Sequence, residues 1–114
     1  MELELDTTGA FPIARLSGEV RSEDGARFIE ELHPLVSQAG SKLAIDLSGV
    51  AWLDSAGLSS LINIVTRARL SGGRAILSGP TPFVAGVLDV TNLDRWFEIV
   101  PDLEEAARRL ADAE

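Results

Sequence analysis

Cysteine is absent from this chain of 114 residues, and histidine and lysine each occur once, as His33 and Lys42. Without thiols the chain can form neither a disulfide framework nor a thiolate metal site. A single histidine argues against a zinc site built from histidines. A phosphate-binding loop of the P-loop type needs a lysine after a glycine-rich turn, whereas Lys42 precedes a hydrophobic segment. We therefore expect no metal and no cofactor.

Long apolar runs and clusters of basic residues are also missing. No run approaches the roughly 20 apolar residues that span a bilayer, and the N-terminus carries Glu2, Glu4 and Asp6 where a signal peptide would be basic. The chain has 18 acidic and 10 basic residues, a net charge of −8, which argues against nucleic acid or an anionic membrane as partner. We expect a cytoplasmic protein without membrane insertion, and a protein partner with a basic patch. The dispersed acidic residues could equally serve solubility alone.

The composition, 46% hydrophobic and 25% charged, is that of a single folded domain over residues 1–114. Hydrophobic periodicity predicts alternating strands and helices. In chain order these are strands over 2–6 and 13–16, a helix capped by Ser22 and broken or kinked near His33 by Pro34, a strand over 43–47, a helix from Asp54 to Gly72-Gly73, a strand over 74–77, a helix capped by Thr81, a strand over 97–100 and a closing helix to Leu110. We expect an α/β fold: a mixed sheet of about five strands, opening with an antiparallel hairpin and continuing in parallel, with about four helices.

The most informative segment is Asp54-Ser55-Ala56-Gly57-Leu58, where a buried strand leads into an amphipathic helix. Asp54 is the expected N-cap, which places Ser55 in the first turn. A phosphate on Ser55 would there meet free N–H groups and the positive end of the helix dipole. A plain structural serine fits the local pattern too. Gly57 indicates that another group approaches the backbone closely.

Catalytic interpretations have weaker support. A serine nucleophile at Ser55 would need a base, and His33, the sole histidine, lies beside a proline on a predicted helix. Asp46 and Asp54 could form an acid/base pair, but loop bonding and helix capping explain them more simply. We expect a protein that is not an enzyme.

The runs Ala44-Ile45-Asp46-Leu47-Ser48-Gly49-Val50 and Leu53-Asp54-Ser55-Ala56-Gly57-Leu58 resemble the signature of STAS domains, especially bacterial anti-sigma factor antagonists. Matches at Leu16–Val20 and Thr91–Leu93 extend the resemblance over most of the chain. The resemblance implies that Ser55 is the phosphate acceptor. It also implies that the unphosphorylated chain binds an anti-sigma factor, a serine kinase of the histidine-kinase-like ATPase class, and that a serine phosphatase resets it. Monomer and dimer both fit the sequence.

Two positions depart from the family pattern. Ala56 stands where antagonists often have serine or threonine, and Arg21 stands where many have aspartate. Arg21 could hold a phosphate on Ser55, or it could be a solvated surface arginine. Trp52, expected in a loop before the motif, could cover the core or anchor a partner. The expected partner-binding residues are Asp54, Ser55, Ala56, Gly57, Ser59, Ser60, Asn63, Arg21 and Trp52.

Two other functions stay open. The chain could be a STAS subunit that docks without phosphorylation on the ATPase of a lipid-transport ABC system or in a stress-signalling complex. It could also be an aspartyl-phosphate receiver with Asp46 as acceptor, but a receiver needs a lysine after a late strand, and no lysine follows Lys42.

Overall fold

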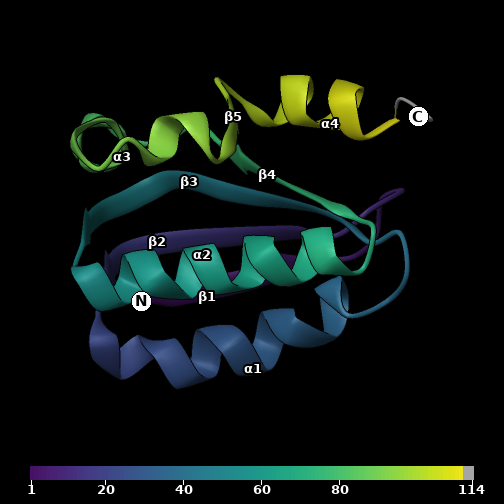
Figure 1. The fold of residues 1–114 in the computed structure, drawn as a ribbon, viewed down its shortest axis with the longest axis horizontal. Coiled ribbons are helices and arrows are strands. Elements are labelled where there is room, and N and C mark those ends of the chain that lie inside the picture. Colours follow the sequence, from purple (N-terminus) through teal and green to yellow (C-terminus); the bar gives the residue numbers. More distant parts are fainter. Residues whose placement is uncertain (112–114) are drawn as a thin grey trace.

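The computed structural model describes residues 1–111, which form one sheet flanked by helices (Figure 1). The elements are β1 (Glu2–Asp6), β2 (Ile13–Val20), the 3-10 turn η1 (Ser22–Asp24), α1 (Gly25–Val36), β3 (Lys42–Leu53), α2 (Ser55–Leu70), β4 (Arg74–Ser78), α3 (Pro82–Val90), the 3-10 turn η2 (Leu93–Arg95), β5 (Glu98–Val100) and α4 (Leu103–Ala111). The strand order is β1-β2-β3-β4-β5. β1 pairs antiparallel with β2 and every later pair is parallel. The predicted mixed sheet is confirmed.

Helices cover both faces of the sheet. α1 and α2 pack on one face, and α3 and α4 lie on the other (Figure 1). β3 runs through the middle of the sheet, and its first half is buried from both sides, as at Leu43, Ala44 and Ile45. Within residues 1–111, no helix is long and apolar enough to cross a membrane.

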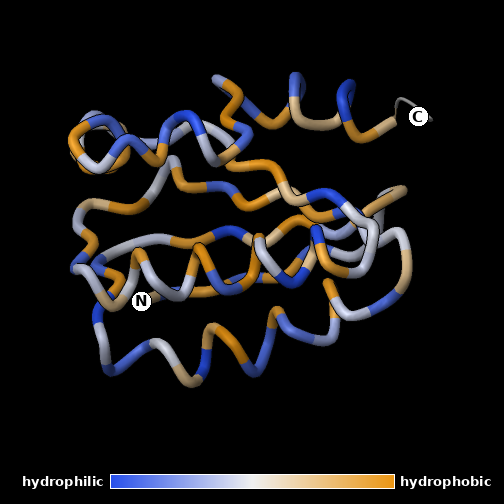
Figure 2. The backbone as a smooth tube through the Cα atoms, viewed as in Figure 1, coloured by the Kyte–Doolittle hydropathy of each residue, from blue (hydrophilic) through white to orange (hydrophobic). Residues whose placement is uncertain are grey.

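Two hydrophobic clusters fill the interior. The larger one joins the sheet to α1, α2 and α3, with Phe28 and Ile64 among its fully buried members. Along α2, hydrophobic positions recur with polar ones between them (Figure 2), the periodicity of a helix with one buried face. The smaller cluster lies under α4 and contains Ala44, Ile76, Val100, Ala106 and Leu110.

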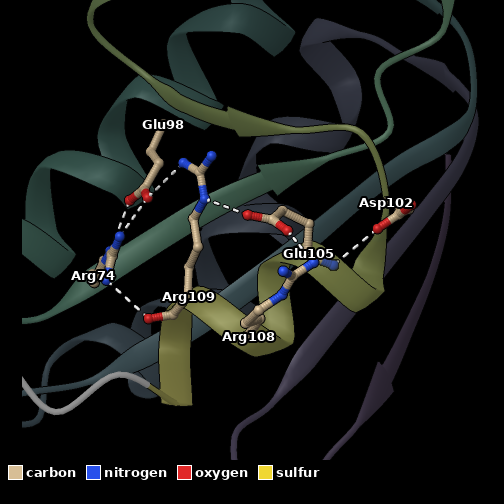
Figure 3. Close-up of polar contacts among 6 residues, drawn as sticks. All are labelled: Arg74, Glu98, Asp102, Glu105, Arg108 and Arg109. Carbon is tan, nitrogen blue, oxygen red and sulfur yellow. Dashed lines mark hydrogen bonds and ion pairs between the residues drawn. The ribbon is translucent and has the colours of Figure 1, made fainter.

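Charged side chains attach α4 to the sheet (Figure 3). Arg74 of β4 donates to both carboxylate oxygens of Glu98, at 2.8 and 2.5 Å, and to the carbonyl of Arg109 at 3.0 Å. Arg109 donates to the same carboxylate at 3.2 Å. Lys42 donates from Nζ to the carbonyl of Leu110 at 2.6 Å. Arg74 and Lys42 thus satisfy two of the last carbonyls of α4 and lie at the negative end of its dipole.

The predicted cap of α1 at Ser22 and the predicted break at Pro34 are both wrong. The helix begins at Gly25, and Ser22 lies in the 3-10 turn before it. The N–H of Ser22 donates to the carboxylate of Asp54, which precedes α2. Pro34 does not break the helix, which continues to Val36. Pro34 lies in the last turn, so the hydrogen bond that it removes is one of the last in α1.

The predicted end of β3 is also wrong. The strand continues from Leu47 to Leu53, because its second half pairs with a lengthened β2: Gly49 lies opposite Ser17 and Leu53 opposite Val20. Pairing across a bulge is invisible in the hydrophobic pattern of one strand. As a result only Asp54 separates β3 from α2.

Candidate functional site

Ser55 is the first residue of α2, and it is exposed. The preceding Asp54 has an extended backbone, and its Oδ1 accepts the N–H of Gly57 at 2.7 Å. The backbone carbonyl of Asp54 accepts the N–H of Leu58 at 2.9 Å, which starts the helix. The predicted cap at Asp54, with Ser55 in the first turn, is confirmed.

Asp54 also connects two segments that are far apart in the sequence. Its Oδ2 accepts the N–H of Ser22 at 3.1 Å, and its own N–H donates to the carbonyl of Val20 at 3.2 Å. The turn after β2 is thereby held against the start of α2. This contact places Arg21, which lies between Val20 and Ser22, beside the junction that carries Ser55.

Gly57 allows the start of α2 to pack directly on β2. A Cβ at this position would lie 2.7 Å from the carbonyl oxygen of Val20 and 2.9 Å from Cδ1 of Leu53. The close approach expected at Gly57 is confirmed, and the approaching group is the chain's own backbone. Gly57 is buried, so its role is to let α2 pack closely on the sheet and not to contact a partner directly.

Arg21 is exposed and has two partners. Its Nε donates to Oε1 of Glu19 at 2.8 Å, and a second guanidinium nitrogen contacts the same oxygen. The guanidinium lies over Trp52, 5.2 Å from the ring centroid, in a cation–π contact. The hydrogen bond with Glu19 is the main cause that raises the pKa of Arg21, and charge attraction to Glu23 and Asp54 adds to it.

Trp52 is neither in a loop nor in the core. It is the second-last residue of β3, and 37% of it is exposed. Neighbouring side chains of a strand point to opposite faces of the sheet. Trp52 therefore lies on the face opposite to the buried Leu53. Its ring stacks on Phe83 of α3, with centroids 6.4 Å apart and an interplanar angle of 26°.

The α2 residues predicted to bind a partner divide into two groups. Ser55, Ser59 and Asn63 are exposed at intervals of four, which places them along one stripe of the helix. The prediction for Ser60 is wrong: it is 9% exposed, faces the start of α1, and donates to the carbonyl of Ala56 at 3.2 Å. The helix period put Ser60 on the polar side, but a neighbouring helix covers it. Ala56 is half-buried.

Two residues of this surface were not predicted. Phe83 was given no role from the sequence; in α3, Val84 and Leu88 are buried and Phe83 is 43% exposed. Glu19 was not predicted as the partner of Arg21. Its position two residues before Arg21, on the same face of an extended chain, is the signal that could have indicated the pair.

The structure separates the residues of the catalytic alternatives. His33 lies in the last turn of α1, where a ring nitrogen is 3.1 Å from Oγ of Ser37. α1 and α2 run side by side in the same direction, so His33 and Ser55 lie at opposite ends of the helix pair. The pairing of Ser55 with His33 is therefore wrong.

The two aspartates of the acid/base alternative, Asp46 and Asp54, also lie far apart. Asp46 lies within β3, eight positions before Asp54, a separation of about 25 Å along an extended strand. Its Oδ1 accepts the N–H of Ser48 at 3.0 Å, which is a bond to backbone within β3 and not to the loop that was expected. Within residues 1–111, no three Asp, Glu or His side chains are grouped closely enough to hold a metal ion.

The sheet order, the helices on both faces and the exposed serine after β3 define a small mixed-sheet α/β domain that presents a hydroxyl at one end of its central strand. A match to the STAS domain covers residues 2–106, and the chain belongs to this family.

Several proteins similar to this chain are named as anti-sigma factor antagonists. A candidate anti-sigma factor antagonist of Bordetella bronchiseptica, BtrV, is 26% identical over 107 residues, which cover 94% of this chain and 92% of BtrV. The crystal structure of a candidate antagonist from Thermotoga maritima has a TM-score of 0.84 at 27% identity, covering 96% of this chain and 95% of that one. Unphosphorylated SpoIIAA, an anti-sigma factor antagonist, shares the fold with a TM-score of 0.78 at 18% identity, over 99% of this chain and 100% of SpoIIAA.

Proposed function

We propose that this chain is an anti-sigma factor antagonist that binds an anti-sigma factor while Ser55 is unphosphorylated and thereby frees a sigma factor. The observation that carries the proposal is the exposed hydroxyl of Ser55 in the first turn of α2, in a chain of the STAS family. The names of similar proteins, BtrV and the Thermotoga maritima protein, support the same function.

The anti-sigma factor is proposed to be a serine kinase of the histidine-kinase-like ATPase class. Its ATP would supply the γ-phosphoryl group to Oγ of Ser55, with ADP as leaving group and loss of the hydroxyl proton. The nucleotide belongs to the partner, so the antagonist acts as substrate and binding module. A serine phosphatase would restore the free hydroxyl. The solved structure of SpoIIAA in a phosphorylated form, in a protein that shares this fold, supports the proposal.

The proposed contact surface has Ser55 at its centre. Around it lie the exposed Ser59 and Asn63 of α2, Arg21 of the turn after β2, and Trp52 of β3. Asp54, Ala56 and Gly57 support this surface as cap and helix backbone, while Ser60 is buried and supports it from inside.

Phosphorylation would separate the complex for an electrostatic reason. A phosphoserine carries a charge of about −1.5 to −2 at neutral pH, and on Ser55 it would lie next to the carboxylate of Asp54. Interface energy is concentrated in a few central residues, so one desolvated, repelled group there costs several kcal/mol. We expect binding to weaken by about a hundredfold or more.

The test is phosphoryl transfer and binding with the purified serine kinase encoded beside the gene. Intact mass and peptide mapping after incubation with ATP should show one phosphate on Ser55. Ser55→Ala should accept none, and Ser59→Ala, an exposed serine one turn further along α2, should accept one as the wild type does. Transfer to another residue, or no transfer together with tight binding to the ATPase of a lipid transporter, would refute the proposal and favour the docking subunit.

A further inference from the structure

We propose that Arg21 binds the phosphate of phosphorylated Ser55. While Ser55 is unmodified, the guanidinium of Arg21 instead contacts Glu19 and Trp52. The inference rests on the proposed phosphorylation of Ser55. It gives the turn after β2 a role in binding the phosphorylated serine. Through Arg21, the phosphate would then affect the exposed aromatic pair of Trp52 and Phe83.

The backbone places Arg21 within reach. Val20 lies opposite Leu53 in the parallel pairing of β2 and β3, so the next residues, Arg21 and Asp54, leave the sheet side by side. The N–H of Ser22 on the carboxylate of Asp54, at 3.1 Å, holds the two segments together beyond the sheet. Paired strands are about 4.8 Å apart, a gap that an arginine side chain can span. Ser55 directly follows Asp54.

The charges around Arg21 explain both its present position and its proposed movement. Carboxylates surround it: Glu19 of β2, Glu23 and Asp24 of η1, and Asp54 before α2. Glu19 holds the guanidinium, Asp24 accepts the backbone N–H of Arg21 at 2.9 Å, and Glu23 and Asp54 act on Arg21 through their charge. Arg21 is the single cation between residues 19 and 24. The other charged side chains of this turn, Glu23 and Asp24, are negative.

A phosphate dianion competes well for this guanidinium. Glu19 offers one negative charge, and both contacts from Arg21 go to a single oxygen, Oε1. The phosphate offers up to two charges and three acceptor oxygens, which suit the planar fork of arginine. Glu19 and Arg21 are also about half exposed, and exposed ion pairs of this kind contribute little stability. Moving the guanidinium to the phosphate would therefore cost little.

The movement would change the surface beyond Ser55. The cation–π contact at 5.2 Å would be lost, and the indole of Trp52 would be left stacked on Phe83 alone. The carboxylate of Glu19 would lose its counter-ion beside the proposed interface. Phosphorylation would thus alter both charge and aromatic contacts on this surface.

The test uses full-length protein with phosphoserine installed at position 55 during synthesis, so it needs no kinase. Phosphorus NMR follows the second ionisation of the phosphate, whose pKa is about 6 in a free phosphoserine. A neighbouring guanidinium favours the dianion and lowers this pKa. We expect a pKa lower by about 0.5 unit or more in the wild type than in Arg21→Gln. Arg69→Gln is the matched control, because Arg69 lies over Trp96 at 4.2 Å near the far end of α2, and it should match the wild type.

A second measurement follows the environment of the Trp52 indole. With 5-fluorotryptophan in place of Trp52 and Trp96, the fluorine signal of Trp52 should shift on phosphorylation in the wild type and stay in place in Arg21→Gln, while that of Trp96 stays in place in both. Equal phosphate pKa values in wild type and Arg21→Gln would overturn the inference. So would an unmoved Trp52 signal. A failed transfer assay, in contrast, would count against the proposed kinase partner, so the two failures are distinguishable.

Discussion

Gly57 packs directly against the end of β2. Nothing larger than hydrogen fits between its Cα and the carbonyl of Val20, because the N-terminal turn of α2 lies directly on the end of β2. Glycine inside a helix ordinarily costs up to about 1 kcal/mol relative to alanine. Glycine is nevertheless required at position 57, because a side chain there would push α2, and Ser55 with it, away from the sheet.

Replacing Gly57 by alanine should destabilise the protein. We expect the free energy of unfolding in urea to fall by about 1–3 kcal/mol, the usual range for overpacking. Gly86 is the control, because it lies in α3 and a Cβ added there would have no neighbour within 4 Å. Gly86→Ala should be neutral or stabilise by up to about 1 kcal/mol. Equal effects of the two substitutions would contradict the role assigned to Gly57.

At the scale of the element, α4 depends on buried apolar contacts and on one partly buried carboxylate. Leu110 and Ala106 pack against Ala44 and Ile76. Above them, hydrogen bonds from Arg74 are the main cause that lowers the pKa of Glu98, and those from Arg109 add to it. The ionised form of Glu98 is thus favoured in the folded protein.

The stability that Glu98 supplies should depend on pH. Since its pKa is lower in the folded than in the unfolded chain, its contribution is complete above the unfolded value, about 4.3, and is lost as the pH falls through the folded value. Glu98→Gln should lower the free energy of unfolding by about 1 kcal/mol at pH 7, since the ion pairs are partly exposed. Chemical denaturation from pH 7 to pH 3 should show the difference from wild type shrinking below about pH 4.5.

Glu30, an exposed glutamate of α1, provides the control. Glu30→Gln should change the stability by less than about 0.5 kcal/mol across this range, as is usual for surface positions. A difference between Glu98→Gln and wild type that stays constant from pH 7 to pH 3 would show that the ionisation of Glu98 does not support α4.

At the scale of the whole molecule, the fold gathers distant segments at one end of the sheet. β2 and β3 run parallel and end together, and α2 starts at that end. The side chain of Thr81, at the start of α3, donates to the carbonyl of Val50 at 2.7 Å and so holds α3 beside β3. This end of the sheet therefore brings β2, β3, α2 and α3 together. The chain around it carries a net charge of −8.

This net charge should accelerate binding to a basic surface. If the partner presents one, raising the salt from 50 to 500 mM should slow association by about tenfold, because it screens the long-range attraction, and should change dissociation much less. Stopped-flow measurement of both rate constants tests this. An association rate that does not depend on salt would show that the acidic balance serves solubility alone.

Local patterns in the sequence predicted what depends on neighbouring residues. Capping chemistry located Asp54 and Thr81, and both caps form as predicted. Alternation of polar and apolar residues indicated the first hairpin. The same local reasoning failed where a partner segment decides: β3 continues past Leu47 because β2 pairs with it, and Ser60 is buried because α1 covers it.

By itself the sequence determined the order of strands and helices, the mixed sheet and the exposed position of Ser55, because periodicity and capping act over a few residues. Only the tertiary structure decided which residues surround Ser55. Arg21, Trp52 and Phe83 come from separate segments and meet through strand pairing and helix packing. Such contacts depend on the three-dimensional register of the whole sheet, which no short stretch of sequence contains.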